Sequence, residues 1–78
     1  MPMSTRQSGV PEGKYTETIY GFIRDQKYED AINILSIELQ TFPRSRAALS
    51  LLGHCYYMLQ DYTNAVVMYE QLVKFFSE

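Results

Sequence analysis

Reactive side chains are scarce in this chain of 78 residues, and their scarcity narrows what it can do. There is one cysteine, Cys55, and one histidine, His54, so an internal disulfide is impossible. A structural zinc site needs four cysteine or histidine ligands, and these two residues are the whole supply. The sequence therefore excludes a disulfide scaffold and a structural zinc site, and we expect no metal and no cofactor.

Clustered positive charge and long apolar runs are also missing. The seven lysines and arginines are scattered, the net charge is −2, and only Arg44 and Arg46 lie close together. Nucleic-acid-binding surfaces need grouped cations to neutralise phosphates, so we expect no nucleic acid partner. No apolar run approaches the roughly 20 residues that span a bilayer, and the first residues lack the apolar core of a signal peptide. We expect no membrane insertion.

What is present is a helical pattern. After a lead-in rich in Pro, Gly, Ser and Thr (residues 1–13), which we expect to be flexible, apolar residues recur at steps of three and four. Polar residues 25–27 interrupt the pattern, and so does Pro43, which cannot donate a helical hydrogen bond. Ser45 and Asp61 are suited to cap the helices that follow. The sequence predicts four helices of about 12–15 residues, joined by short turns and therefore antiparallel.

The two halves of the pattern repeat. A shift of 34 residues aligns Phe22 with Tyr56, Gln26 with Gln60, Tyr28 with Tyr62, Ala31 with Ala65, Ile32 with Val66, and Phe42 with Phe76. A helix-turn-helix period of 34 residues is typical of the tetratricopeptide repeat. We therefore predict an all-α fold of two tetratricopeptide (TPR) repeats, the start of an α-solenoid. The first repeat, residues 14–45, is degenerate, and the second, residues 46–78, is truncated without the closing proline.

Small residues mark where the helices of a repeat should approach most closely. Gly53 and Ala65 stand at that contact in the second repeat, and Ala31 is the equivalent of Ala65 in the first. Cys55 is expected to fill the helix interface as a small apolar residue. Adjacent residues on a helix point about 100° apart, so His54 and Cys55 lack the contact and the orienting third group that a nucleophile needs. We expect no catalytic residues and no enzyme activity.

The first helix of each repeat should present one face to a groove. The 34-residue register places eight residues there: Thr16, Tyr20, Ile23, Arg24, Ser50, His54, Tyr57 and Met58. Tyr, Met and Ile exposed together are unusual on a surface without a partner, and aromatic, Met and Arg residues are enriched at interfaces, so we interpret this face as a partner-binding groove. A solvated helix face with a few stray apolar groups is the alternative. Glu38 falls where the repeat prefers a small apolar residue, and we expect it to be partly exposed or ion-paired.

Several runs resemble one particular family. EGKYT, SRAALSLLGHCYY, QDYTNA and YEQL, within Val10–Leu72, are similar to the start of the tetratricopeptide subunit of intraflagellar transport complex B, the tetratricopeptide repeat protein thirty family. The resemblance implies a non-catalytic scaffold of cilium and cytoplasm that binds an extended segment of another complex B subunit. It also implies a part in cilium assembly and a link to axonemal tubulin polyglutamylation. The alternative is a free-standing two-repeat interaction module unrelated to cilia.

The last helix lacks the polar outer face that usually caps a solenoid. It ends on the apolar residues Val73, Phe75 and Phe76. Terminal repeats normally need a polar cap to stay soluble. We therefore expect an exposed apolar face on this helix, through which the chain could self-associate.

Overall fold

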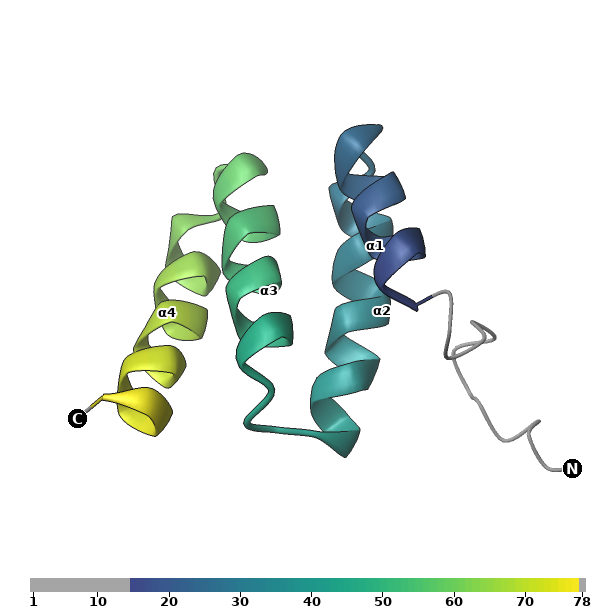
Figure 1. Ribbon diagram of the computed structural model, residues 1–78. Coiled ribbons are helices and arrows are strands. Elements are labelled where there is room, and N and C mark those ends of the chain that lie inside the picture. Colours follow the sequence, from purple (N-terminus) through teal and green to yellow (C-terminus); the bar gives the residue numbers. More distant parts are fainter. Residues whose placement is uncertain (1–14, 78) are drawn as a thin grey trace, which may run out of the picture.

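The computed structural model describes residues 15–77, which form four α-helices and no strand (Figure 1). The helices are α1 (Tyr15–Arg24), α2 (Tyr28–Thr41), α3 (Arg46–Met58) and α4 (Tyr62–Phe76). The all-α prediction and the positions of the breaks are confirmed, although α1, with 10 residues, is shorter than expected. The predicted lead-in, residues 1–13, lies outside the described residues. No helix within residues 15–77 has both the length and the hydropathy needed to cross a membrane.

The two helical hairpins turn in the same way. Gln26 and Gln60, which are 34 residues apart, both adopt a positive φ, of 62° and 64°. Around each lies the same pair of backbone hydrogen bonds: Lys27 N to Phe22 O (2.7 Å) with Gln26 N to Ile23 O (3.0 Å), and Asp61 N to Tyr56 O (2.9 Å) with Gln60 N to Tyr57 O (2.9 Å). This combination closes a helix with one left-handed residue. The repeat therefore extends to the backbone, as two stacked TPR repeats require.

Side-chain caps start the second hairpin where the sequence predicted them. The Ala48 amide donates to the Ser45 hydroxyl at 3.2 Å, which caps α3. The Asn64 amide donates to Asp61 Oδ1 at 3.3 Å, and its side-chain nitrogen donates to Asp61 Oδ2 at 2.8 Å. Each cap satisfies an amide that has no partner within the helix. These caps fix the residue at which α3 and α4 begin.

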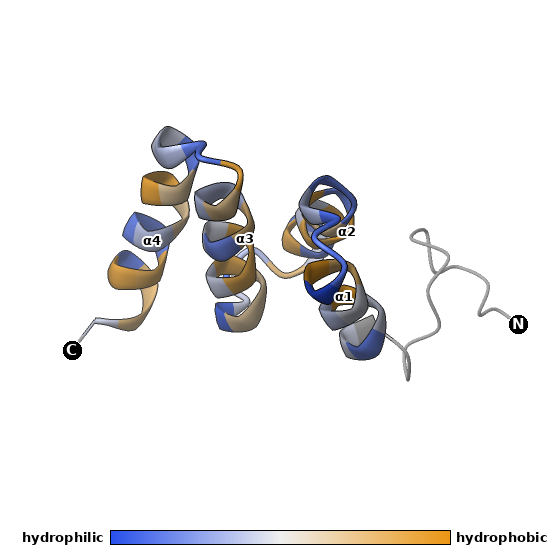
Figure 2. Ribbon diagram, turned by 90° about the horizontal axis from the view of Figure 1, so that it is seen from above, coloured by the Kyte–Doolittle hydropathy of each residue, from blue (hydrophilic) through white to orange (hydrophobic). Residues whose placement is uncertain are grey.

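The helices pack in chain order. In Figure 1, α4, α3 and α2 stand in a row and α1 lies in front of α2; Figure 2 shows the same order from above. One apolar cluster joins the two hairpins, and its buried members are Ile19, Ala31, Leu35, Ala48, Leu52 and Cys55. The side chain of Cys55 is fully inaccessible, so its predicted place in the helix interface is confirmed. Because α3 contributes half of this cluster, it connects the first repeat to the second.

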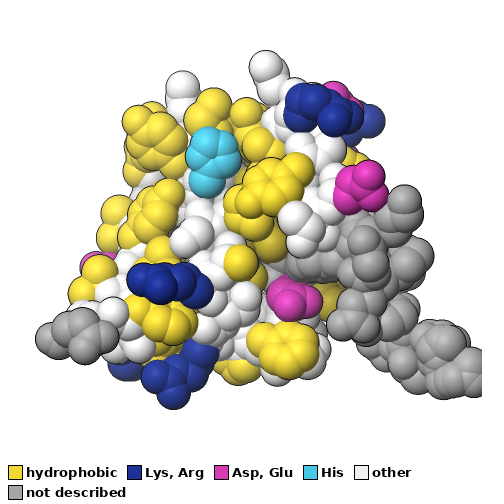
Figure 3. Space-filling view, viewed as in Figure 1, with side chains coloured by type: hydrophobic (Ala, Val, Ile, Leu, Met, Phe, Trp, Pro, Cys, Tyr) yellow, Lys and Arg dark blue, Asp and Glu magenta, His cyan; other side chains and the backbone are white. Residues whose placement is uncertain are grey.

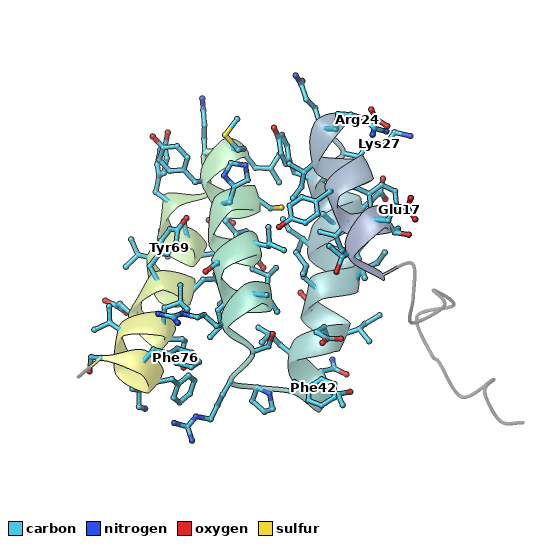
Figure 4. All side chains as sticks on the ribbon, viewed as in Figure 1. Glu17, Arg24, Lys27, Phe42, Tyr69 and Phe76 are labelled. Carbon is cyan, nitrogen blue, oxygen red and sulfur yellow. The ribbon has the colours of Figure 1, made fainter. Side chains whose placement is uncertain are left out.

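Small residues set the approach of α4 to α3. A Cβ atom added at Gly53 would lie 2.6 Å from Cζ of Tyr69 on α4, closer than carbon atoms can pack. Tyr69 is labelled on α4 in Figure 4. Ala65 is also buried on α4, as its equivalent Ala31 is on α2. The predicted small-residue contact is therefore confirmed, and the Tyr69 ring occupies the space that Gly53 leaves.

The end of α4 differs from the expectation. Phe75 and Phe76 are half-buried, because the guanidinium groups of Arg44 and Arg46 lie over their rings at 4.9 Å and 5.1 Å. Such contacts stabilise exposed sites by about 0.5–1 kcal/mol each. The exposed apolar face lies elsewhere on α4, at Val66, Tyr69 and Val73, with Val73 at 65% exposure. Figure 2 shows hydrophobic segments of α4 on its side away from α3.

We predict that Gly53→Ala lowers the free energy of unfolding by about 1–2 kcal/mol, because the added methyl group must displace the Tyr69 ring. Urea denaturation followed by circular dichroism would measure it. The matched control is Gly21→Ala in α1, where the nearest atom to an added Cβ is 3.8 Å away. There the change should raise stability by about 0.5–1 kcal/mol, because alanine restricts the unfolded chain. Equal effects of the two substitutions would contradict the close contact at Gly53.

Candidate functional site

A partly enclosed cleft of ≈ 230 Å³ lies between α1 and α3, and it is the candidate site for partner binding. Its floor is apolar, formed by Ile19, Leu35 and Ala48, all buried. Its rim carries Thr16 and Tyr20 from α1, Ala47 and Leu51 from α3, and the polar side chains of Glu38 and Ser45. The cleft is thus a short apolar trough with one carboxylate at its edge.

The position of the cleft follows from the packing order. Since α2 packs against both α1 and α3, it forms the floor between them, and the two first helices of the repeats become the walls. Figure 3, viewed as in Figure 1, shows this side of the molecule: hydrophobic side chains surround the histidine, and basic and acidic groups lie both among the hydrophobic side chains and at the edges. The face is therefore mixed.

The predicted groove residues of the first repeat divide into two pairs. Thr16 and Tyr20 line the cleft, and Tyr20 is largely exposed on its rim. Ile23 is half-buried against the core and does not line the cleft. Arg24 is exposed at the end of α1, and its Nε lies 3.3 Å from Oδ1 of the neighbouring Asp25. Figure 4 labels Arg24 at that end of the helix.

The predicted groove residues of the second repeat are all exposed, but none of them lines the cleft. Ser50 borders a different hollow, of ≈ 380 Å³, beside Leu72 and Val73 of α4. The His54 ring meets the Tyr28 ring edge-on, with centroids 6.3 Å apart. Tyr57 meets Tyr62 in the same manner at 5.4 Å, and Met58 is exposed at the end of α3. His54, Tyr57 and Met58 therefore form a separate patch towards the end of α3, beside the starts of α2 and α4, and Ser50 lies apart from it.

The predicted groove contained Thr16 and Tyr20 of the cleft but missed its buried floor and four residues of its rim: Glu38, Ser45, Ala47 and Leu51. The 34-residue shift hid Ala47 and Leu51, because their equivalents are Gly13 and Glu17, which differ from them in character. The sequence did contain a signal for this pair. Ala47 and Leu51 are four residues apart, so they lie on one face of α3, and each comes directly before a residue of the buried pair Ala48 and Leu52. Glu38 was predicted to be partly exposed or ion-paired. Its side chain is half-buried, so the prediction of partial exposure is confirmed.

The single cysteine and the single histidine lie in different environments. Burial raises the pKa of the Cys55 thiol, which keeps it protonated and a poor nucleophile. His54 is exposed and faces Tyr28, whereas Cys55 points into the core. Within residues 15–77, no three His, Cys, Asp or Glu side chains gather in a way that could hold a metal ion. What the surface can do is contact another protein through apolar and aromatic groups.

Comparison with known proteins connects the chain with intraflagellar transport. No protein-family model matches the chain. The chain is similar to intraflagellar transport protein 70. It is 54% identical to intraflagellar transport protein 70A of Xenopus tropicalis over 72 residues, 92% of this chain. It is also 54% identical to the Danio rerio 70A protein over 88% of the chain, and 52% identical to the Rattus norvegicus 70B protein over 83%.

The similarity covers a small part of these relatives. The chain spans 11% of the length of the Xenopus tropicalis and Danio rerio proteins and 10% of the Rattus norvegicus protein. More than half of the aligned residues are nevertheless identical over most of this chain, which links it to the intraflagellar transport proteins. The resemblance to an intraflagellar transport subunit is confirmed at this level. The remaining nine tenths of intraflagellar transport protein 70 have no counterpart among these 78 residues.

Proposed function

We propose that the chain is a non-catalytic scaffold whose α1–α3 cleft binds an extended segment of another subunit of intraflagellar transport complex B. The observation that carries this proposal is the apolar cleft bounded by Tyr20 and Leu51. At ≈ 230 Å³ it is smaller than the cavities of roughly 300–1,000 Å³ that bury small molecules, so side chains of a peptide fit it better. Because its relatives are named intraflagellar transport proteins, we propose that the chain acts in cilium assembly.

The binding mode follows from the shape of the cleft. An extended peptide lets every second side chain enter an apolar trough while the others face solvent. Tyr20 supplies a rigid aromatic wall, of the kind enriched at interfaces, and it loses little entropy when a partner covers it. The exposed patch of His54, Tyr57 and Met58 is a second contact for the same segment or its neighbour. The link to tubulin polyglutamylation would follow from the assembled complex, not from this chain's own chemistry.

We predict that Tyr20→Ala combined with Ala47→Glu reduces recovery of complex B subunits from ciliated cells at least tenfold. Alanine removes the aromatic wall, and the glutamate places an unpaired charge at the cleft rim. Co-precipitation with quantitative mass spectrometry, at matched amounts of folded bait, would measure the loss.

The control is Tyr57→Ala combined with Met58→Ala, which alters the second patch and leaves the cleft intact. It should reduce recovery less than the cleft variant does. Equal recovery by the wild-type chain and the cleft variant would rule out the cleft as the binding site. Recovery of unrelated proteins alone would favour a free-standing interaction module without a role in cilia.

We also propose that α4 is a contact surface for a further helix. In the first repeat, Leu35 of α2 is buried in the cluster that includes residues of α3, and Ile32 and Leu39 are partly buried against it. Their equivalents one repeat later are Val66, Tyr69 and Val73 of α4, of which Val66 is 51% and Val73 65% exposed. The same positions thus present an apolar stripe without the helix that covers it in the first repeat. A second copy of the chain can supply that helix, which is the self-association predicted from the sequence.

We predict that the chain self-associates with rising concentration in sedimentation velocity experiments, because dimerisation buries Val66 and Val73. Val73→Glu should shift the equilibrium towards monomer, with unchanged helix content by circular dichroism. Asn33→Glu, at an exposed position of α2, adds the same charge away from the stripe and serves as the control. A monomer at all concentrations up to the millimolar range would contradict self-association through α4.

A further inference from the structure

A second, more open hollow adjoins the cleft at the turn between α2 and α3. It measures ≈ 820 Å³ and is lined by Thr41, Phe42, Pro43, Arg44, Glu38, Ser45 and Phe75. Its walls are mainly apolar, and Phe42 is 56% exposed beside it. Figure 4 labels Phe42 and Phe76 at the same end of the molecule, where the hollow opens. Glu38 and Ser45 line both this hollow and the α1–α3 cleft, so the two adjoin at these residues.

Glu38 stands at the junction without a partner. Its side chain is half-buried, and it forms no hydrogen bond or ion pair with any residue of the described chain. Arg44 also lines the hollow, but its guanidinium group lies over the Phe75 ring and makes no ion pair with Glu38. A carboxylate that is partly removed from water and unpaired gains more from an approaching cation than an exposed one does.

The apolar hollow and the carboxylate together specify the partner's chemistry. A cation at Glu38 would lie at the edge of a surface formed by Phe42, Pro43 and Phe75, which suits an apolar side chain. In an extended chain, residues i and i+2 point to the same side and can meet adjacent sites. An acidic residue at the same place would meet the unpaired Glu38 carboxylate and be repelled.

We propose that the junction at Glu38 selects extended segments that carry a lysine or arginine and, two residues away, a large apolar side chain. The cation pairs with the Glu38 carboxylate, and the apolar group enters the hollow against Phe42 and Phe75. The proposal rests on the proposed function, since it names the side-chain chemistry of the segment that the cleft binds.

The test uses two synthetic nine-residue peptides of Gly and Ser that carry Lys-Ser-Leu or Gln-Ser-Leu at the centre. Each is titrated into the ¹⁵N-labelled chain and followed by amide chemical shifts. We expect the lysine peptide to shift the amides of Glu38, Phe42 and Phe75 and to bind at least fivefold more tightly than the glutamine peptide. Glu38→Gln should remove that difference, because the variant keeps the shape of the side chain and loses its charge.

Glu29→Gln is the matched control, since Glu29 is an exposed carboxylate on the opposite face of α2. It should leave the preference for the lysine peptide unchanged. Equal binding of the two peptides, no binding of either, or a preference that survives Glu38→Gln would each overturn the proposal. If Glu38→Gln has no effect on complex B recovery while the Tyr20 and Ala47 changes abolish it, the selectivity fails and the proposed function stands.

Discussion

The structure depends on how closely α2 and α4 can pack against the two sides of α3. Towards α2, its small residues Ala48 and Cys55 complete the cluster around Ile19 and Leu35. Towards α4, Gly53 leaves the space that the Tyr69 ring occupies. Interiors are packed as tightly as organic crystals, so each of these small side chains fixes a helix position to within a fraction of a methyl group. The cleft exists because α3 sits at this distance from α2, with α1 on the other side of the same floor.

Most of the fold could be predicted from the sequence because its signals are local. Pro43, Ser45 and Asp61 act on backbone geometry within a few residues, and their effects do not depend on distant contacts. Gly53 and Ala65 could be recognised because the 34-residue period gives each position a known environment. The positive φ at Gln26 and Gln60 follows from the same period, although neither residue signals it alone.

The binding surface was harder to predict because a repeat register assumes equal surroundings for equivalent residues. Thr16 and Tyr20 face a neighbouring helix, α3, whereas their equivalents Ser50 and His54 in the second repeat face α4 or Tyr28. Residues at equivalent positions of the two repeats therefore have different surroundings in the structure. The stacking of Arg44 and Arg46 on the two phenylalanines also depends on the meeting of residues far apart in the sequence. No pattern of spacing reports such contacts.

The proposed function also separates the regular core of the repeats from their surfaces. The regular parts of the repeats build the core and offer no reactive group, whereas the surfaces with unmet contacts are the cleft, the hollow at Glu38 and the outer face of α4. All three are apolar surfaces suited to another polypeptide. This agrees with relatives named for intraflagellar transport, of which this chain covers about a tenth of the length. In a stacked repeat protein each unit contacts only its neighbours, so a short stretch can still carry a complete local binding surface.

Amide hydrogen exchange under native conditions tests the central role of α3 most directly. Exchange slows where opening requires the loss of buried contacts on several sides. The account predicts that the amides of Leu52 to Tyr56, at the centre of α3, exchange more slowly than those of α1 and of the outer half of α4. Exchange at the centre of α3 as fast as in α1 or α4 would contradict it, because α3 would then not be the element on which the two hairpins depend.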